Sequence, residues 1–339
     1  MKTKILITMQ EYYFQKVILG DPSLSQNYYQ SLKERLLIEY RDKKLTDING
    51  SKVIDNGCGQ TLQITNRDKI NFDLCENNFK NQMMTNLKLL PKIGIKTEKK
   101  LKKEGYTTIQ DLTKHKTYAE YAEKFMQNIK DMEFSEILDL LNQNRYGRQC
   151  RDNLVKCLSI PDSEDFKFMD IETLGLSNAA IILIGVAEIK NNHIITTQYF
   201  LRSPDEEIAV LDAYLSHLDD DSVHVTFNGK TFDIPFIKNR LRYHRMDCEL
   251  DRAHIDLMYY SKYLWGKKLP NCQLQTIEKY KLGLERKEDV PGKYIPDYYR
   301  TYLEEKNIGP MIPIIQHNRQ DVISLAEFMM IMYEEVKGV

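Results

Sequence analysis

The pattern of apolar and polar positions after residue 160 alternates between strand-like and helix-like segments. A Pro-Asp-Ser turn at 161–163 marks a boundary. The segments FKFMDIE, AAIILIGVAEI and HIITTQYF predict three successive strands, and the second is apolar enough to be buried on both faces. VHVTF and AHIDLM predict two more strands, each followed by a helix, and a last helix is expected at about 317–335. This order predicts an α/β fold: a mixed sheet flanked by helices.

The first 160 residues have a different pattern. A helix is expected around residues 28–40, and GSKVIDNGCGQTLQI at 50–64 predicts a hairpin that turns at its Asn-Gly pair. Residues 119–155 are charged and helical in pattern. We therefore expect three parts: an N-terminal region of unassigned role at 1–80, a smaller, mainly helical region at 81–160, and the α/β domain at 161–339.

Composition indicates a globular protein of a reducing compartment. Hydrophobic residues make up 42% of the chain and charged residues 29%. The six cysteines form no CxxC pair, so neither a zinc site nor a disulfide framework is indicated. No apolar run approaches 18 residues, and the N-terminal sequence does not resemble a secretory signal. We expect a cytoplasmic location and no membrane contact.

The formal net charge of −1 is unevenly distributed. Residues 86–130 hold eleven lysines against five acids, a local charge of +6. Within them, LKLLPKIGIKTEKKLKKEGYTTIQDL at 87–112 resembles a helix-hairpin-helix element, a module that binds nucleic-acid phosphates. It predicts a tight loop, a Lys-rich helix, and a second helix that starts at Thr107 or Thr108. Asp111 would close an acidic variant of a capping box there.

Phosphate binding by this element would use a glycine and a helix N-terminus. Gly94 permits close backbone approach, and free N–H groups follow it. Here Lys92 stands where the usual hairpin has its first glycine. A solvated Lys-rich helix face is the alternative interpretation. The predicted phosphate contacts are Gly94, Lys96, Thr97 and Lys100.

Acidic residues recur where the predicted elements end. Asp170 and Glu172 lie two apart in the first strand, so they share one face. Asp233 follows the Asn-Gly turn after the fourth strand, and His317 and Asp321 lie one turn apart on the last helix. We therefore expect four carboxylates from three elements to converge. Two Mg²⁺ or Mn²⁺ ions would offset their repulsion and serve phosphodiester hydrolysis. In isolation, Asp233 is equally typical of a helix N-cap.

DIET, NGKTFDIPF, HIDL and HNRQDVISL together resemble the exonuclease motifs of the DEDD superfamily, on a ribonuclease H-like fold. The chain is most similar to predicted ribonuclease H-like exonucleases with an upstream helix-hairpin-helix-like segment. The resemblance implies that Asp170, Glu172, Asp233 and Asp321 bind the metals, and that His317 orients or deprotonates the attacking water. It also implies contacts of the terminal nucleotide with four further residues: Thr173, Leu174, Asn228 and Phe232.

The function implied is a metal-dependent 3′→5′ exonuclease that acts on DNA or RNA, at a single strand or 3′ end. A structure-specific endonuclease on the same fold is an alternative, with the basic segment placing branched or gapped substrate. A catalytically silent nucleic-acid-binding module is another. Product size separates the two enzymes, because mononucleotides indicate an exonuclease and defined oligonucleotides an endonuclease.

Overall fold

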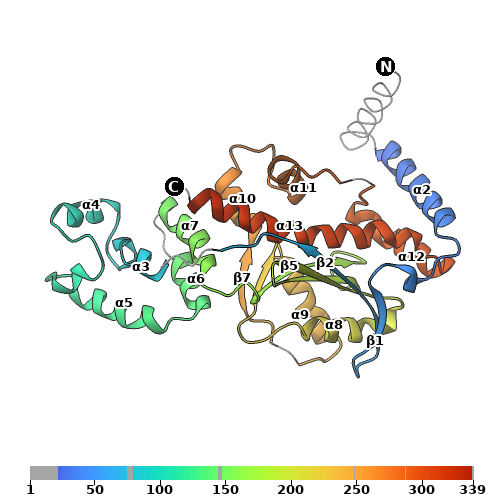
Figure 1. The fold of residues 1–339 in the computed structure, drawn as a ribbon, viewed down its shortest axis with the longest axis horizontal. Helices are drawn as coiled ribbons and strands as arrows, with labels where there is room; N and C mark the ends of the chain where they lie inside the picture. The colour runs from blue at the N-terminus through green and yellow to red at the C-terminus, as the bar shows by residue number, and fades with distance from the viewer. Residues whose placement is uncertain (1–21, 75–78, 144–146, 248, 287, 338–339) are drawn as a thin grey trace, which may run out of the picture.

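The computed structural model describes residues 22–74, 79–143, 147–247, 249–286 and 288–337. Seven strands form one mixed sheet in the order β1-β2-β5-β4-β3-β6-β7 (Figure 1). Their bounds are β1 Ser51–Asp55, β2 Gln60–Lys69, β3 Phe166–Thr173, β4 Ile181–Lys190, β5 His193–Phe200, β6 Val223–Thr226 and β7 Ala253–Asp256. β3, β6 and β7 are parallel, and the other neighbouring strands are antiparallel. The predicted α/β fold with a mixed sheet is confirmed, and all five strands predicted after residue 160 are present.

Helices cover both faces of the sheet (Figure 1). The long helix α13 crosses one face with α10 beside it, and α8 and α9 cover the other. The α-helices are α2 Pro22–Glu39, α3 Phe79–Met83, α4 Ile95–Lys103, α5 Ala119–Asp131, α6 Phe134–Gln143, α7 Gly147–Lys156, α8 Glu207–Leu215, α9 Asp233–Tyr243, α10 Leu257–Trp265, α11 Leu274–Ile277, α12 Ile295–Glu305 and α13 Ile312–Lys337. No helix of the described ranges is long and apolar enough to cross a membrane.

Each face of the sheet has its own apolar core. One core joins Phe166 and Phe168 to α13, and the other joins Met169 and Ile171 to α8 and α9. This division follows from the two-residue period of β3. β4 is buried at every position except its last residue, which explains why its sequence is a continuous apolar run.

The N-terminal hairpin is part of the main sheet. β1 and β2 turn at the predicted Asn-Gly pair, where Gly57 has φ +82°. β2 then pairs with β5 along eight residues, so residues 51–69 extend the sheet that we predicted from residues 161–339 alone. The three predicted parts of the chain stay a prediction, but this hairpin has a structural role that its own sequence does not reveal.

Two helix boundaries differ from expectation. α13 begins at Ile312 rather than near His317. Its second residue, Pro313, does not prevent this, because proline is tolerated in the first turn of a helix. Near Thr108 the capping box forms: Thr108 N donates to Asp111 Oδ2 at 2.8 Å, and Asp111 N donates to Thr108 Oγ1 at 3.1 Å. Only the 3₁₀ turn Asp111–Lys114 follows, and the next α-helix starts at α5.

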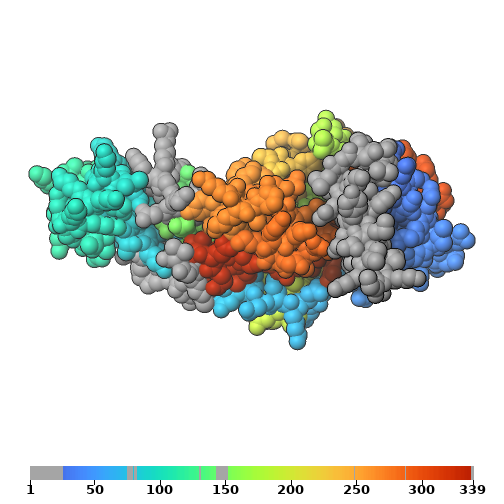
Figure 2. All heavy atoms as spheres, turned by 90° about the horizontal axis from the view of Figure 1, so that it is seen from above, coloured from blue at the N-terminus to red at the C-terminus, as the bar shows by residue number. Residues whose placement is uncertain are grey.

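The segment from α3 to α5 forms a lobe at one end of the molecule. Figure 2 shows its residues set apart from those of α10 to α13 above the sheet. α2 lies at the opposite end (Figure 1). The Lys-rich helix α4 is therefore well separated from the end of β3.

Replacing Leu62 tests whether the hairpin belongs to the cooperative core. Leu62 on β2 is fully buried, while Val53, its partner on β1, is 41% exposed. We expect Leu62→Ala to lower the free energy of unfolding by about 2–5 kcal/mol, because it leaves a cavity. Val53→Ala is the matched control and should cost less than about 1 kcal/mol. Urea unfolding measures the free energy of unfolding of both variants. A loss for Leu62→Ala as small as that for Val53→Ala would show that the hairpin unfolds independently of the sheet.

Candidate active site

The predicted pair on β3 lies at the centre of the sheet. Asp170 and Glu172 follow Phe166 and Phe168 on the face toward α13. Glu172 is 8% exposed, and its Oε1 has no hydrogen-bond partner among the described residues. Two carboxylates are thus held side by side in a largely buried position.

Asp233 reaches the same place from the opposite face. It is the first residue of α9, and its Oδ1 accepts a hydrogen bond from Ile171 N at 3.2 Å. The loop before it is held by Asp256, which accepts from Asn228 N at 2.8 Å and from Lys230 N at 3.1 Å. Asp256 also caps α10, so one buried carboxylate positions both the loop and that helix.

α13 brings three further polar side chains to β3. His317 Nε2 lies 3.1 Å from Asp321 Oδ2 and 3.9 Å from Glu172 Oε1. Asn318 Nδ2 donates to the Asp170 carboxylate at 2.9 Å and to its backbone oxygen at 3.0 Å. The structure therefore brings together all five predicted catalytic residues, from β3, α9 and α13.

The carboxyl groups of this cluster perturb one another's ionisation. Burial raises the pKa of Asp170 well above its usual value, and Asp321, Glu172 and Asp233 raise it further. Burial likewise raises the pKa of Glu172 to about 8 and that of Asp233 to about 7. These shifts show that the protein alone supplies too little positive charge for the whole cluster to ionise.

His317 and Asp321 balance each other. Burial opposes the charged form of His317, but the Asp321 charge and hydrogen bonds to Asp289 and Asp321 raise its pKa to about 11. Burial also opposes ionisation of Asp321, but His317 and Arg286 hold its pKa below the usual value. Nδ1 of the ring contacts Asp289 and lies 3.0 Å from Arg286 Nη1, and Nε2 lies 3.1 Å from Asp321, so the two carboxylates favour the charged form of His317.

Arg286 is a site residue that the sequence analysis missed. Its guanidinium bonds to the Asp321 carboxylate and forms a fork with Glu278, at 2.6 and 2.7 Å. Glu278 is fully buried and also accepts from Ser324 Oγ at 2.5 Å. The run RKEDVPG, which contains Arg286 and Asp289, was the available signal, but nothing local to it indicates that it folds back on α13.

The chemistry of the donor set fits divalent cations. Four carboxylates converge, and one buried oxygen of Glu172 has no hydrogen-bond partner. Carboxylate oxygens are the ligands that Mg²⁺ and Mn²⁺ prefer. As the described residues lie, no three His, Cys, Asp or Glu side chains already enclose an ion site. Asp321 is instead paired with Arg286 and His317, so its carboxylate is not directed at the other three carboxylates.

A row of hydrogen-bonded polar groups across one face of the sheet holds α13 in position. Gln198 Nε2 donates to Asn318 Oδ1 at 2.8 Å, and Asn318 in turn bonds to Asp170. Gly185 pairs with both Asp170 and Gln198 across β4, and a Cβ added there would lie 2.2 Å from Asn318 Oδ1. The close approach of α13 to the acidic strand therefore requires glycine at position 185.

The four residues predicted to contact the terminal nucleotide lie beside the acidic cluster in the chain. Thr173 ends β3, and Leu174 follows it, partly buried against the core. Asn228 has a left-handed backbone with φ +69°, and Phe232 packs on Phe236 with ring centroids 5.5 Å apart. These contacts occupy Leu174 and Phe232 in packing. Leu176, not singled out from the sequence, is the most exposed large apolar side chain of the described residues, at 88%.

The predicted phosphate-binding residues lie apart from this cluster, in the terminal lobe. Gly94 is the N-cap of α4, and the side chains of Lys96 and Lys100 are exposed. Lys92 has φ +67°, so it adopts the backbone conformation that glycine usually provides. Lys100 forms an exposed ion pair with Glu104 at 3.7 Å. The loop before α4 thus makes a tight turn, although Lys92 stands where the motif that it resembles has a glycine.

The candidate site lies within the part of the chain that matches a known family. Residues 167–333 match the family model described as the RNase H superfamily. The strand order and this match together identify an RNase H-like fold. The chain is also 33% identical over 174 residues to "Uncharacterized protein YprB" of Bacillus subtilis (strain 168). That alignment covers 50% of this chain and 42% of the relative, so the chain spans less than half of the relative's length.

Gly185→Ala tests the approach of α13 to β3. The added methyl group would displace Asn318, so we expect unfolding to become easier by about 1–3 kcal/mol. Gly292→Ala is the control, because an added Cβ there meets no atom within 4 Å. Thermal or urea unfolding measures both variants. An unchanged stability for Gly185→Ala would contradict the contact.

Proposed function

We propose that this protein is a metal-dependent 3′→5′ exonuclease. The observation that carries the proposal is the convergence of Asp170, Glu172, Asp233 and Asp321, whose pKa values are mutually perturbed. Perturbed carboxyls gathered at one site are typical of a catalytic centre. The RNase H-like fold supports a phosphodiester as the substrate.

The four carboxylates would hold two divalent cations, Mg²⁺ or Mn²⁺. When bound, such ions supply stabilisation of the charge that develops on a phosphodiester during hydrolysis. Asn318 orients Asp170 through its 2.9 Å hydrogen bond, and the backbone N–H of Ile171 orients Asp233. These supporting hydrogen bonds keep the ligand oxygens directed into the site.

His317 would accept the proton of the attacking water. Its Nδ1 is bonded to Asp289, so Nε2 is the nitrogen that faces Glu172 and Asp321. Cations bound at those carboxylates would offset two of the charges that hold the ring protonated, while Asp289 would keep Nδ1 in place. Nε2 is then free to accept a proton near neutral pH.

The substrate strand would end between β3 and the loop before α9. Thr173 and Asn228 would offer polar contacts there, and the parts of Leu174 and Phe232 that packing leaves accessible would offer apolar ones. Gly94, Lys96, Thr97 and Lys100 would hold phosphates at the lobe, with free N–H groups at the start of α4.

A structure-specific endonuclease is the second candidate. The position of α4 favours it, because a basic helix at the far end of the molecule suits a duplex or branch better than a short 3′ end. A silent binding module is the third candidate, and strand binding without cleavage in Mg²⁺ or Mn²⁺ would favour it.

A cleavage assay tests the nuclease and separates these candidates. Purified protein is incubated with end-labelled single-stranded DNA, duplex DNA and RNA in Mg²⁺, Mn²⁺ or EDTA. We expect a ladder that shrinks from the 3′ end, releases mononucleotides and is absent in EDTA. Asp170→Asn should slow it by about 10³-fold, or roughly 4 kcal/mol.

Asp139→Asn, an exposed carboxylate on α6, is the matched control and should cleave as the wild type does. Oligonucleotides of defined size would support the endonuclease instead. Binding without cleavage on every substrate would favour the silent module.

Arg286→Gln tests metal binding without an activity measurement. The change leaves Glu278 buried without its cation and leaves Asp321 with His317 alone, so we expect a loss of about 3–5 kcal/mol in EDTA. Mn²⁺ should restore more stability to this variant than it adds to the wild type, because the ion replaces the lost charge at Asp321. Thermal melting with and without Mn²⁺ measures this.

Arg35→Gln is the control, because its ion pair with Glu288 is exposed and should contribute less than about 1 kcal/mol. An identical response to Mn²⁺ in Arg286→Gln and wild type would argue against an ion at Asp321.

A further inference from the structure

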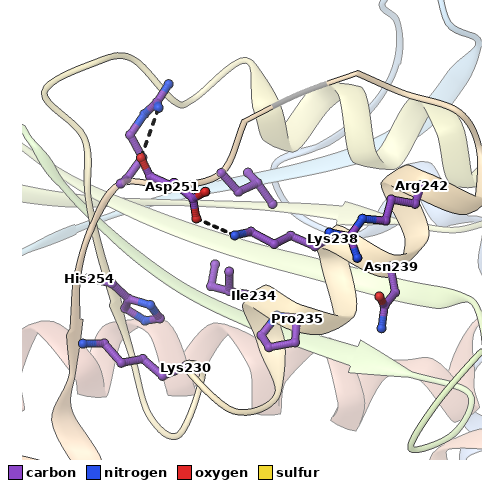
Figure 3. Close-up of a pocket in the computed structure, with 10 residues that line it drawn as sticks. Lys230, Ile234, Pro235, Lys238, Asn239, Arg242, Asp251 and His254 are labelled. Carbon is purple, nitrogen blue, oxygen red and sulfur yellow. Dashed lines mark hydrogen bonds and ion pairs between the residues drawn. The ribbon is translucent and has the colours of Figure 1, made fainter.

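A basic cavity lies on the outer side of α9, away from the acidic side chains. Its volume is about 430 Å³, between α9 and the segment that leads into β7 (Figure 3). Four cationic side chains line it together with one carboxylate: Lys230, Lys238, Arg242, Arg252 and Asp251. The lining therefore has an excess of positive charge on a protein whose formal net charge is −1.

Two of these cations are available to a ligand. Lys238 pairs with Asp251 at 2.5 Å, and Arg252 lies 3.6 Å from Asp220. The side chains of Lys230 and Arg242 are exposed, and neither has an ion-pair or hydrogen-bond partner within the described part of the chain. Uncompensated cations at a cavity are the usual feature of an anion site.

The ionisation of a histidine in the cavity wall agrees with a positive local potential. Burial lowers the pKa of His254 to about 3, and His224, Lys230 and Lys238 lower it further. His254 points into the cavity beside Lys230 (Figure 3). A neutral His254 adds no charge, so Lys230 and Arg242 are the groups that would bind an anion.

The cavity and the candidate active site share one segment of the chain, the loop before α9 and α9 itself. Lys230 lies in the loop that also holds Asn228, and this loop ends at Asp233. From Asp233 to Arg242, α9 advances about 14 Å at 1.5 Å per residue. At roughly 3.4 Å per nucleotide, a strand that starts at the acidic cluster would cover this length with about four nucleotides.

We propose that this cavity binds backbone phosphates of the substrate strand several nucleotides away from the reacting end, through Lys230 and Arg242. The inference rests on the proposed nuclease function and adds to it the path of the strand along α9. The ligand is a phosphodiester chain, which DNA and RNA share. An apolar part of the wall at Ile234 and Pro235 leaves room for sugars without selecting a base.

The test is equilibrium binding by full-length protein that also has Asp170→Asn, so that the probe is not degraded. The probes are fluorescent single strands of about 12 nucleotides, in DNA and RNA versions. Lys230→Gln with Arg242→Gln should weaken binding about tenfold. It should also reduce the slope of log K against log salt by about 1.4, because each phosphate contact in a single strand contributes about 0.7. If the double variant binds both the DNA and the RNA probe more weakly, the phosphate backbone is the ligand. If it binds only one of them more weakly, the proposal that the site binds the backbone common to both is overturned.

Arg41→Gln with Lys43→Gln is the matched control. It removes the same guanidinium and ammonium charges from exposed positions after α2, at the other end of the molecule from the lobe. Equal weakening by the two double variants would overturn the proposal, as would wild-type affinity and salt slope in the Lys230 and Arg242 variant. Failure of every probe to bind the parent protein would overturn it as well.

A parallel measurement separates this inference from the nuclease itself. The wild type is assayed for hydrolysis of the p-nitrophenyl ester of thymidine 5′-monophosphate, a phosphodiester too short to reach Arg242. No hydrolysis together with cavity-dependent strand binding would reject the nuclease and keep the phosphate site. Hydrolysis together with unchanged binding in the variant would reject the phosphate site and keep the nuclease.

Discussion

The attraction between buried carboxylates and the few cations that reach them determines how this domain is organised. Asp170, Glu172 and Asp233 are buried at the end of the central strand, where burial favours their neutral forms. His317 and Arg286 bring positive charge mainly to Asp321, and His317 also lies 3.9 Å from Glu172. The protein thus holds an acidic site with incomplete compensation, and such a site gains stability from any cation that binds it. Charge that destabilises the fold is kept where it would serve catalysis.

The packing of α13 connects this electrostatic feature to the rest of the fold. The helix carries His317, Asn318 and Asp321 on the side toward the sheet, and its C-terminal half completes one apolar core. Gly185 permits the close contact, and Gln198 holds Asn318 in place. Movement of α13 away from β3 would therefore separate the carboxylates and open the core at the same time. Stability and the candidate site depend on the same helix.

Positive charge is placed around this acidic centre rather than in it. The lobe that contains α4 and the cavity beside α9 both present lysine or arginine to solvent. A polyanion is attracted by such surfaces over about a Debye length, roughly 10 Å in 0.1 M salt. Without them, the carboxylates of the site would repel a phosphate backbone. The arrangement suits a protein that must bring one anion into contact with another.

The amino-acid sequence by itself determined the elements and the chemical groups. Short apolar and alternating runs located β3 to β7, and the i, i+2 and i, i+4 spacings placed Asp170 with Glu172 and His317 with Asp321. These are local properties, set by backbone geometry within a few residues. Only the tertiary structure decided that the β1–β2 hairpin joins the sheet, that Gly185 faces Asn318, and that Arg286 reaches Asp321 across 35 residues of chain. Such contacts depend on the packing of several elements at once, so no short stretch of sequence contains them.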